Sequence, residues 1–438
     1  MIRRGYGEGY IYACTVAFIV AVSVLMFGSV EPWAFAVSAS FAAAGFNFFA
    51  VRDRSGLIRM LGSIRLLSFA FAGFFFICLL QLIPLPLSLL KVLSPAKYAL
   101  CAEIGAGGAG GISFYNYDSL NGTLRLAVYA MVFLLAVNAG KDRAGAARTI
   151  KMVVLFGFLL ALFAIIQESA WNGKIYWFRG LSQGRFPFGP FVNRNHFAGF
   201  MGMVIPLGLG LALDIRRTEE TFLYLFFSII MALSLFYSLS RGGVISFSIS
   251  TVFFLFLSIM RKMSAKSKRT LYIGLFVSLL LALLLYLGIW PILGRFAEMG
   301  VSDEGRLMAW KAAIRAIKDY PLMGTGIGTF RYVYPVYNPG MQMKFLYAHN
   351  DYLQLLVETG FAGALFAGLC LISVLAGIVR SYRKGNVSFL MAGLTSSLLY
   401  ISVHSLFDFN LHIPSNAITL SAVLGLAVAS ATGSDGFK

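Results

Sequence analysis

Charged residues are scarce in this chain, and acidic residues are the scarcest of them. Of the 438 residues only 12% are charged, while 59% are hydrophobic, and 18 acidic residues stand against 36 basic ones. The mean hydropathy is +0.79. A soluble domain of this length requires a far more polar surface, so the composition excludes an ordinary soluble protein and predicts a membrane protein.

Cysteine is rare as well, with four residues in the whole chain. The cysteines lie far apart, in or near different apolar segments, and none has the spacing of a metal site or of an evident disulfide. They are Cys14, Cys78, Cys101 and Cys370. We interpret them as apolar packing residues, and we expect neither a metal nor another cofactor.

Long apolar runs make up most of the sequence. They are about 20 residues long and do not alternate with a period of two, which predicts membrane-spanning helices. We therefore predict an all-α, polytopic integral membrane protein in which residues 1–438 form a single membrane domain with about twelve spans. The predicted spans are 10–30, 33–50, 66–90, 122–139, 148–168, 196–213, 221–239, 242–260, 271–290, 350–379, 388–405 and 412–432.

The positive charge lies in alternate loops. A net charge of +18 is also typical of nucleic-acid binding, but Lys and Arg accumulate in the cytoplasmic loops of membrane proteins. Of the 36 basic residues, 20 fall in six segments that are all cytoplasmic if the N-terminus is inside. This pattern predicts that both termini are cytoplasmic and that no nucleic acid is bound. The longest polar loop then lies outside, which in a bacterium is the periplasmic face of the inner membrane.

That loop is the one long polar interruption in the sequence. We predict that residues 291–349 form a periplasmic loop, or lid, between the ninth and tenth spans. Within it, residues 303–319 are predicted to form a helix with Ser302 as its N-cap. Four apolar residues make one stripe and three basic residues make a flank, which is typical of a helix at a membrane surface. The stripe is Leu307, Trp310, Ile314 and Ile317, and the flank is Lys311, Arg315 and Lys318.

Arg306 stands apart from these basic residues. It falls on the opposite flank, beside Ala309 and Ala313, where small side chains permit close approach by another element. Solvation therefore explains Arg306 least well of the basic residues in the helix. The glycine run from Gly324 to Phe330 follows as a loop and resembles a nucleotide-binding fingerprint only superficially, since no strand precedes it.

All four histidines, His196, His349, His404 and His412, fall at predicted outer ends of spans. Histidine tolerates membrane interfaces, so a purely structural role is an alternative for the other three. A zinc site is a further alternative, but no two histidines sit at ligand spacing on one helix. His349 stands out because Asn350 can cap the helix that follows and thereby fix the backbone around it.

Arg241 occupies an unusual place, at the outer end of a span and directly before Gly242 and Gly243. An arginine at this depth usually has an anionic partner. One interpretation is that it reaches lipid phosphate, and the other is that its planar guanidinium binds a pyrophosphate. Near the same face the segment Asn193, Arg194, Asn195 and His196 supplies a further cation and amide groups.

Acidic residues at this face are few. Asp351, Gln354 and Glu358 recur at i, i+3 and i+7, which predicts one polar stripe on a helix. The span that contains them is longer than the hydrocarbon core, so its first turns are expected to stand above the lipid and Glu358 need not be deeply buried. For Asp408 and Glu358, pairing with nearby arginines is at least as good an interpretation as catalysis.

Together these pieces resemble the O-antigen ligase and O-antigen polymerase superfamily of bacterial cell-envelope glycosyltransferases, and most closely the ligase. The resemblance extends from about residue 185 to 415, and the first 120 residues carry no assignable motif. The matching motifs are Phe191-Val-Asn-Arg-Asn-His-Phe-Ala-Gly199, Ser240-Arg-Gly-Gly243, Gly305-Arg-Leu-Met-Ala-Trp310, Pro321-Leu-Met-Gly-Thr-Gly-Ile-Gly-Thr-Phe330, Ala348-His-Asn-Asp-Tyr-Leu353, Glu358-Thr-Gly360 and His404-Ser-Leu-Phe-Asp-Phe409.

The resemblance implies an activity. A glycan passes from an undecaprenyl-diphosphate carrier to an acceptor hydroxyl, such as one on lipid A-core, without a nucleotide sugar, metal or cofactor. It implies that Arg241 and Arg306 hold the diphosphate and that His349 contacts or deprotonates the acceptor hydroxyl. Departure of the diphosphate from the side opposite to the attacking hydroxyl makes the transfer inverting. The supporting residues are then Asn193, Arg194, Asn195, His196, Asp351, Glu358 and Asp408.

Two other functions compete with a ligase. An O-antigen or exopolysaccharide polymerase uses the same donor and differs only in its acceptor, which is another carrier-linked glycan. A transporter of polysaccharide precursors is expected to place ionisable groups or broken helices near the membrane midplane. The first nine predicted spans carry almost no central charge, which disfavours transport.

Overall fold

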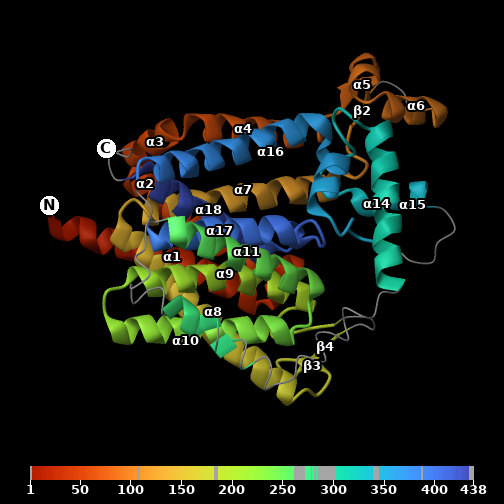
Figure 1. Cartoon of the computed structure of the whole chain (residues 1–438). Helices are drawn as coiled ribbons and strands as arrows, with labels where there is room; N and C mark the ends of the chain where they lie inside the picture. The colour runs from red at the N-terminus through yellow and green to blue at the C-terminus, as the bar shows by residue number, and fades with distance from the viewer. Residues whose placement is uncertain are drawn as a thin grey trace.

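The computed structural model describes residues 2–105, 109–181, 186–260, 272–277, 279–280, 283, 301–338, 345–385 and 388–433. Most of these residues are helical, which confirms the all-α prediction. The long helices run side by side as a bundle (Figure 1). The bundle helices are α1 (Ile2–Leu25), α2 (Pro32–Arg52), α3 (Arg54–Ser63), α4 (Arg65–Leu80), α7 (Asn116–Ala139), α8 (Arg143–Ser169), α9 (Arg194–Asp214), α10 (Thr218–Tyr237), α11 (Arg241–Met260), α16 (Asp351–Arg383), α17 (Phe389–His404) and α18 (Pro414–Thr432).

Eight of the described helices are long and apolar enough to cross a membrane. Helices α3 and α4 meet at a bend of 95° and give a ninth span if the pair is counted as one, and two shorter apolar helices cover 9–25 and 389–404. The predicted span 271–290 lies mostly outside the described residues. A polytopic membrane fold is therefore confirmed, and the number twelve stays a prediction.

One predicted span ends early. The apolar run 66–90 was expected to be a single helix, but α4 ends at Leu80, four residues before Pro84. Proline lacks a backbone N–H and restricts the residue before it, so the chain turns here into the short strand β1 (Leu85–Pro86). Strand β1 pairs with β2 (Ala109–Gly110), which lies in a glycine-rich segment.

Helix α9 forms the centre of the bundle, and its apolar window is entirely buried. Small residues let α17 approach its backbone. A Cβ atom on Gly210 would lie 2.5 Å from the carbonyl oxygen of Phe389, and one on Gly393 would lie 2.5 Å from that of Pro206. Packing through small residues is the usual way in which helices associate in membranes. This contact packs the last turns of α9 against the first turns of α17.

One end of the bundle carries a cap of shorter elements. Helix α14 (Val301–Asp319) lies across the ends of the long helices, close to α15, α5 and α6, whereas α1 begins and α18 ends at the other end (Figure 1). The remaining short elements lie between bundle helices. They are η1 (Phe27–Ser29), α5 (Leu87–Leu93), α6 (Pro95–Glu103), β3 (Lys174–Ile175), β4 (Arg179–Gly180), α15 (Phe330–Tyr337) and η2 (Asn410–His412).

Helix α14 packs as its sequence predicts, with one correction at its start. It begins at Val301, so Ser302 lies inside the helix and is not its N-cap. The small side chains of Ala309 and Ala313 are fully buried, in a cluster with residues of α15 and α16, which confirms the predicted close approach. The apolar side chains of Leu307 and Ile314 are exposed on the other side, as expected of a helix at a membrane surface.

Helix α16 is broken at Gly360, where φ is 60° and ψ is −169°. The chain from Pro321 to Gly326 crosses the gap and bonds to both halves of the helix. The N–H groups of Thr325 and Gly326 donate to the carbonyls of Val357 and Glu358, at 2.9 and 3.0 Å. The N–H groups of Phe361 and Ala362 donate to the carbonyls of Pro321 and Leu322, at 2.7 and 3.0 Å. The break therefore leaves these helix backbone groups satisfied.

Candidate active site

His349 lies directly before α16, at the capped end of the bundle. As predicted, the Asn350 side chain is the N-cap and accepts hydrogen bonds from the N–H groups of Tyr352 and Leu353, both at 3.0 Å. The backbone of His349 has a φ of 52°, a left-handed conformation that costs a non-glycine residue free energy. A strained backbone held by a firm cap gives this imidazole a fixed direction.

The His349 imidazole faces the Asp408 carboxylate. His349 Nδ1 lies 3.4 Å from Asp408 Oδ1, and the His349 side chain is 23% exposed while that of Asp408 is 1% exposed. The imidazole also contacts the rings of Phe345 and Phe409, with centroids 5.8 and 4.8 Å away. One ring nitrogen therefore faces a carboxylate, which is how proteins orient a histidine that works as a base.

Asp408 is held in the turn that follows α17. The N–H of Asp351 donates to the carbonyl of Ser405 at 2.9 Å, and the Asn350 amide donates to the carbonyl of Leu406 at 3.2 Å, so this turn is tied to the start of α16. Burial opposes ionisation of Asp408, but the nearby imidazoles of His349, His196 and His404 outweigh it and lower its pKa below the ordinary value. Asp408 is thus an anion at neutral pH.

Arg241 begins α11, at a tight corner beside His404. The Ser240 hydroxyl accepts a hydrogen bond from the N–H of Gly243 at 3.2 Å, which opens the helix. A Cβ atom on Gly242 would lie 3.2 Å from His404 Cδ2, so only glycine lets this corner come so near the imidazole. The predicted diphosphate residue Arg241 therefore stands next to a segment that touches His404.

Arg306 reaches the same neighbourhood from α14. Its charge acts on His404. The residue before it, Gly305, lies against Phe345, because a Cβ atom there would be 2.8 Å from Phe345 Cζ. Since Phe345 contacts the His349 imidazole, α14 brings Arg306 close to the site in space. His404 is thus the common neighbour of the segments that carry Arg241 and Arg306.

The segment before α9 contributes one residue to the site and three to the helix start. Asn193 caps the helix by accepting a hydrogen bond from the N–H of Asn195 at 2.9 Å. The Arg194 guanidinium lies over the Phe186 ring, 5.1 Å from its centroid. His196 alone reaches the site, where its buried imidazole contacts the Phe409 ring at 4.8 Å. Asn193, Arg194 and Asn195 are predicted site residues whose described interactions are local.

A second histidine with two carboxylates lies beside this one. His412 Nδ1 is 2.9 Å from Asp351 Oδ1, and its Nε2 is 3.8 Å from Glu358 Oε2. Burial alone would lower the pKa of His412, but the hydrogen bonds and charges of the two carboxylates raise it to about 9. At neutral pH His412 is therefore a cation that neutralises part of the polar stripe, which the sequence had placed correctly on one face of α16.

Glu358 corrects an expectation. Glu358 is only 2% exposed, and none of its hydrogen-bond or ion-pair partners among the described residues is an arginine. The carboxylate accepts hydrogen bonds from the N–H of Gly328 at 2.8 Å, from the Gln354 amide at 2.9 Å and from the N–H of Phe330 at 3.3 Å. The glycine run from Gly324 to Phe330 thus wraps a carboxylate of the protein itself. Asp408 likewise pairs with His349 and with the N–H of Phe409, not with an arginine.

Gln81 is the residue that the sequence reasoning missed. Its fully buried amide donates to the carbonyls of Met323 and Glu358, at 2.7 and 2.8 Å, and accepts from the N–H of Ile327 at 3.1 Å. It therefore joins α4 to the loop after α14 and to α16. The available signal was a lone amide at the end of an apolar run, shortly before two prolines.

Several buried polar atoms around His349 have unused hydrogen-bonding capacity among the described residues. They include Asp408 Oδ2, His196 Nε2, Asn410 Nδ2, Asn416 Oδ1 and Ser405 Oγ. Such groups are costly to bury unless water or a ligand reaches them. Among the described residues, no three His, Cys, Asp or Glu side chains are arranged to hold a metal ion.

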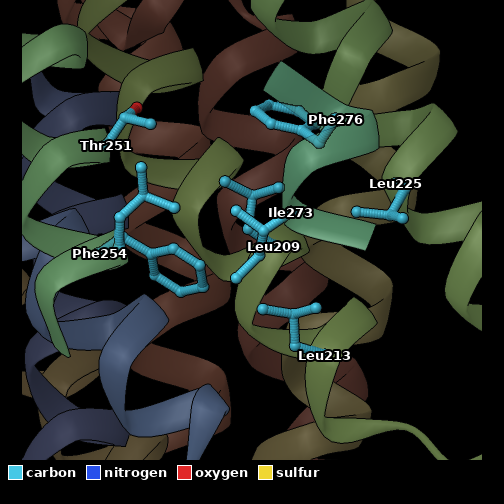
Figure 2. Close-up of a pocket in the computed structure, with 8 residues that line it drawn as sticks. Leu209, Leu213, Leu225, Thr251, Phe254, Ile273 and Phe276 are labelled. Atoms are coloured by element: carbon cyan, nitrogen blue, oxygen red, sulfur yellow. The ribbon is translucent and has the colours of Figure 1, made fainter. Parts of the chain in front are cut away.

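A small pocket lies elsewhere, between α9, α10 and α11 (Figure 2). Its walls are almost entirely apolar, with Thr251 as the polar member. The other lining residues are Leu209, Leu213, Leu225, Phe254, Leu255, Ile273 and Phe276. The pocket adjoins the last turns of α9, whereas His196 sits in the first turn, so it is remote from the polar cluster. Nothing in its lining suits a charged or glycan substrate.

Comparison with protein-family models gives one match. Residues 226–368 match the family model described as O-Antigen ligase. This segment contains Arg241, Arg306 and His349, while Asp408 and His412 lie beyond it. No curated protein matches the chain. The match covers about a third of the chain and confirms there the resemblance that the sequence motifs carry.

Proposed function

We propose, from this O-antigen ligase domain and from the geometry around His349, that the protein transfers a glycan from undecaprenyl diphosphate to an acceptor hydroxyl. The observation that carries the proposal is the meeting of three segments far apart in the chain. His349 faces the ionised Asp408, and the segments of Arg241 and Arg306 both adjoin His404, a few residues from Asp408 along the chain. A base and two guanidinium groups are what this reaction requires.

His349 is proposed to accept the proton of the acceptor hydroxyl. With Nδ1 turned toward Asp408, the other ring nitrogen, Nε2, is the one available to the substrate. Imidazole is the side chain that most often serves as a general base in enzymes. The Asp408 carboxylate stabilises the imidazolium that forms, and its burial keeps the pair free of competing water.

Arg241 and Arg306 are proposed to hold the carrier diphosphate. The acceptor oxygen forms a bond with the anomeric carbon while the bond from that carbon to the diphosphate oxygen breaks, which inverts the anomeric centre. The hydroxyl proton passes to His349, and the electron pair of the broken bond leaves with the diphosphate. Guanidinium groups form bidentate hydrogen bonds with phosphate oxygens and stabilise the negative charge that builds up there.

The proposed setting is the outer face of a bacterial inner membrane. Both chain ends lie opposite α14 in the bundle (Figure 1), which agrees with cytoplasmic termini and a periplasmic site. The predicted cytoplasmic arginines near 52–59, 143–148 and 216–217 lie where α2 and α9 end and α8 and α10 begin. We further propose that residues 291–349 act as a lid over the site and that lipid A-core is the acceptor.

The decisive experiment removes the gene from its host and analyses the carrier-linked glycans. Long glycans that accumulate on undecaprenyl diphosphate support a ligase, and plasmid-borne wild type restores normal levels while His349→Ala or Arg241→Ala does not. Single repeat units on the carrier indicate instead the polymerase, which uses the same donor with another carrier-linked glycan as acceptor. Unchanged carrier lipids contradict both activities and leave transport of the precursor as the alternative.

A further inference from the structure

Arg125 is an arginine inside a membrane-spanning helix, one that the proposed reaction has not used. It sits in α7, and its guanidinium lies over the ring of Phe35, 5.4 Å from the centroid. Phe35 belongs to the first turn of α2, so this pair marks the outer edge of the bundle. Among the residues that the structure describes, none accepts a hydrogen bond from Arg125 or forms an ion pair with it.

Two other arginines at this end of the bundle, Arg179 and Arg331, have carboxylate partners, whereas Arg194 lies over Phe186. Arg179 pairs with Glu31 at 2.8 Å and lies over the Phe27 ring as well. Arg331 pairs with Asp118, in the first turn of α7. Arg125 thus lies over an aromatic ring, as Arg179 does, but it has no carboxylate partner among the described residues. An ionisable residue at membrane depth is costly, and it usually marks a site where a ligand supplies the missing charge.

The face of α7 that carries Arg125 points toward the site. Asp118, Gly122 and Arg125 follow one another at i, i+4 and i+7, so they share one side of the helix. A Cβ atom on Gly122 would lie 3.0 Å from the Ile327 side chain, in the glycine run that wraps Glu358. One turn further along the helix, the charge of Arg125 acts on Tyr347, two residues before His349.

Tyr347 links the neighbourhood of Arg125 to that of His349. The Tyr347 ring stacks on Phe409 with centroids 4.3 Å apart, and Phe409 contacts His349 at 4.8 Å. Arg125 therefore adds a cation on the side of the site that Tyr347 covers. In an inverting displacement the acceptor approaches from the side opposite to the leaving diphosphate.

We propose that Arg125 binds a lipid-borne phosphate group on the Tyr347 side of the site. Two lipids bring phosphate to this level of the membrane: a phosphorylated glycolipid acceptor, whose use rests on the proposed function, and a bulk acidic phospholipid. The guanidinium supplies charge and a fork of N–H donors for phosphate oxygens, while Phe35 covers its face. Neither role places Arg125 in contact with the reacting atoms, so it is a positioning residue for a bound lipid.

The first arm of the test measures transfer by purified wild type, Arg125→Gln, Arg125→Lys and the control Arg315→Gln. Arg315 is exposed on α14, and among the described residues its one hydrogen bond goes to the carbonyl of Tyr337 at the end of α15, at 3.4 Å. With a phosphorylated acceptor, Arg125→Gln is expected to raise KM about tenfold with little change in kcat, as loss of a charged hydrogen bond predicts. With the dephosphorylated acceptor, the wild type and Arg125→Gln should have the same KM. Arg125→Lys should recover part of the difference.

The second arm needs no transfer at all. Native mass spectrometry counts the phosphatidylglycerol molecules that remain on each variant after release from nanodiscs of phosphatidylglycerol or of phosphatidylcholine. Loss of one bound phosphatidylglycerol in Arg125→Gln, with equal KM values in the first arm, assigns the site to a phospholipid. A KM effect alone assigns it to the acceptor. The inference is overturned if Arg125→Gln has the same KM values, the same number of bound phosphatidylglycerol molecules and the same thermal unfolding as wild type. If the wild type itself shows no transfer, the proposed function is contradicted, and the second arm alone tests the phosphate site.

Discussion

Two histidines at the capped end of the bundle pair with carboxylates, yet their surroundings differ in every respect that matters for chemistry. His349 lies 3.4 Å from one aspartate, on a left-handed backbone, beside buried polar atoms with unused hydrogen-bonding capacity. His412 lies 2.9 Å from Asp351 and also faces Glu358, which raises its pKa to about 9. The comparison teaches that a carboxylate neighbour alone does not identify a base. A histidine with two such neighbours keeps its proton at neutral pH and serves as a structural cation.

Replacing His349 is the strongest test of the different roles assigned to His349 and His412. We expect His349→Ala to lower the transfer rate by roughly 10² to 10⁴, the usual contribution of a general base, without lowering the thermal unfolding temperature. His349→Gly should be equally inactive and somewhat more stable, since glycine adopts a φ of 52° without strain. Single-turnover transfer and a thermal shift assay in detergent measure the two effects. Retained activity in either variant removes His349 from its role.

Replacing His412 should produce the opposite result. His412→Leu leaves Asp351 and Glu358 buried without their cation, and removal of one partner from a buried ion pair typically costs about 3 to 5 kcal/mol. We expect a much lower unfolding temperature and poor yield, while the folded fraction keeps its substrate specificity. The triple variant Asp351→Asn, Glu358→Gln, His412→Leu should recover part of the stability. An unchanged unfolding temperature in His412→Leu shows that the ion group is unimportant.

The two histidines should also differ in how pH affects stability. The pKa of His412 is raised in the folded protein, so its stabilising effect is complete below the unfolded value near 6.5 and is lost as pH rises through about 9. The shift corresponds to at most about 3 kcal/mol of unfolding free energy. Unfolding temperatures of wild type and His412→Gln between pH 6 and 10 should therefore converge at high pH. Parallel curves would refute the assignment.

Asp408 should give the smallest of these effects. Asp408→Asn keeps the size of the side chain and removes the charge that faces His349. We expect a loss in kcat of roughly 10- to 100-fold, the range for groups that orient a working imidazole. A variant with wild-type kcat would reduce Asp408 to a packing residue.

Some of this site is readable in the sequence, for physical reasons. Asn350 is recognisable as a helix cap, and the alanines of α14 predict close packing against another element. Both signals are local, because each depends on residues of a single helix. Asp351, Gln354 and Glu358 share a face by helical periodicity alone. These inferences depend on spacing within a single element, and the structure confirms each of them.

The partners of these residues are not readable in the same way. That Asp408 meets His349, or that Glu358 is wrapped by backbone N–H groups, depends on how α16 and α17 pack and where a loop crosses. Arginine was the reasonable guess for both carboxylates, since it is the common partner of buried acids. Gln81 lies more than 200 residues from the groups it binds, so periodicity and motif spacing carry no trace of its role.

The break in α16 has a consequence for how the protein is made. The carbonyls of Pro321 and Leu322 and the N–H groups of Thr325 and Gly326 complete this helix, and they are synthesised before it. The segment from Pro321 to Gly326 is therefore synthesised before the helix that it completes. The two halves of α16 can therefore form all of their hydrogen bonds only if residues 321–326 are already in place beside them. Gly360→Ala should accordingly reduce the amount of protein that completes assembly, while the molecules that do complete it work at the normal rate.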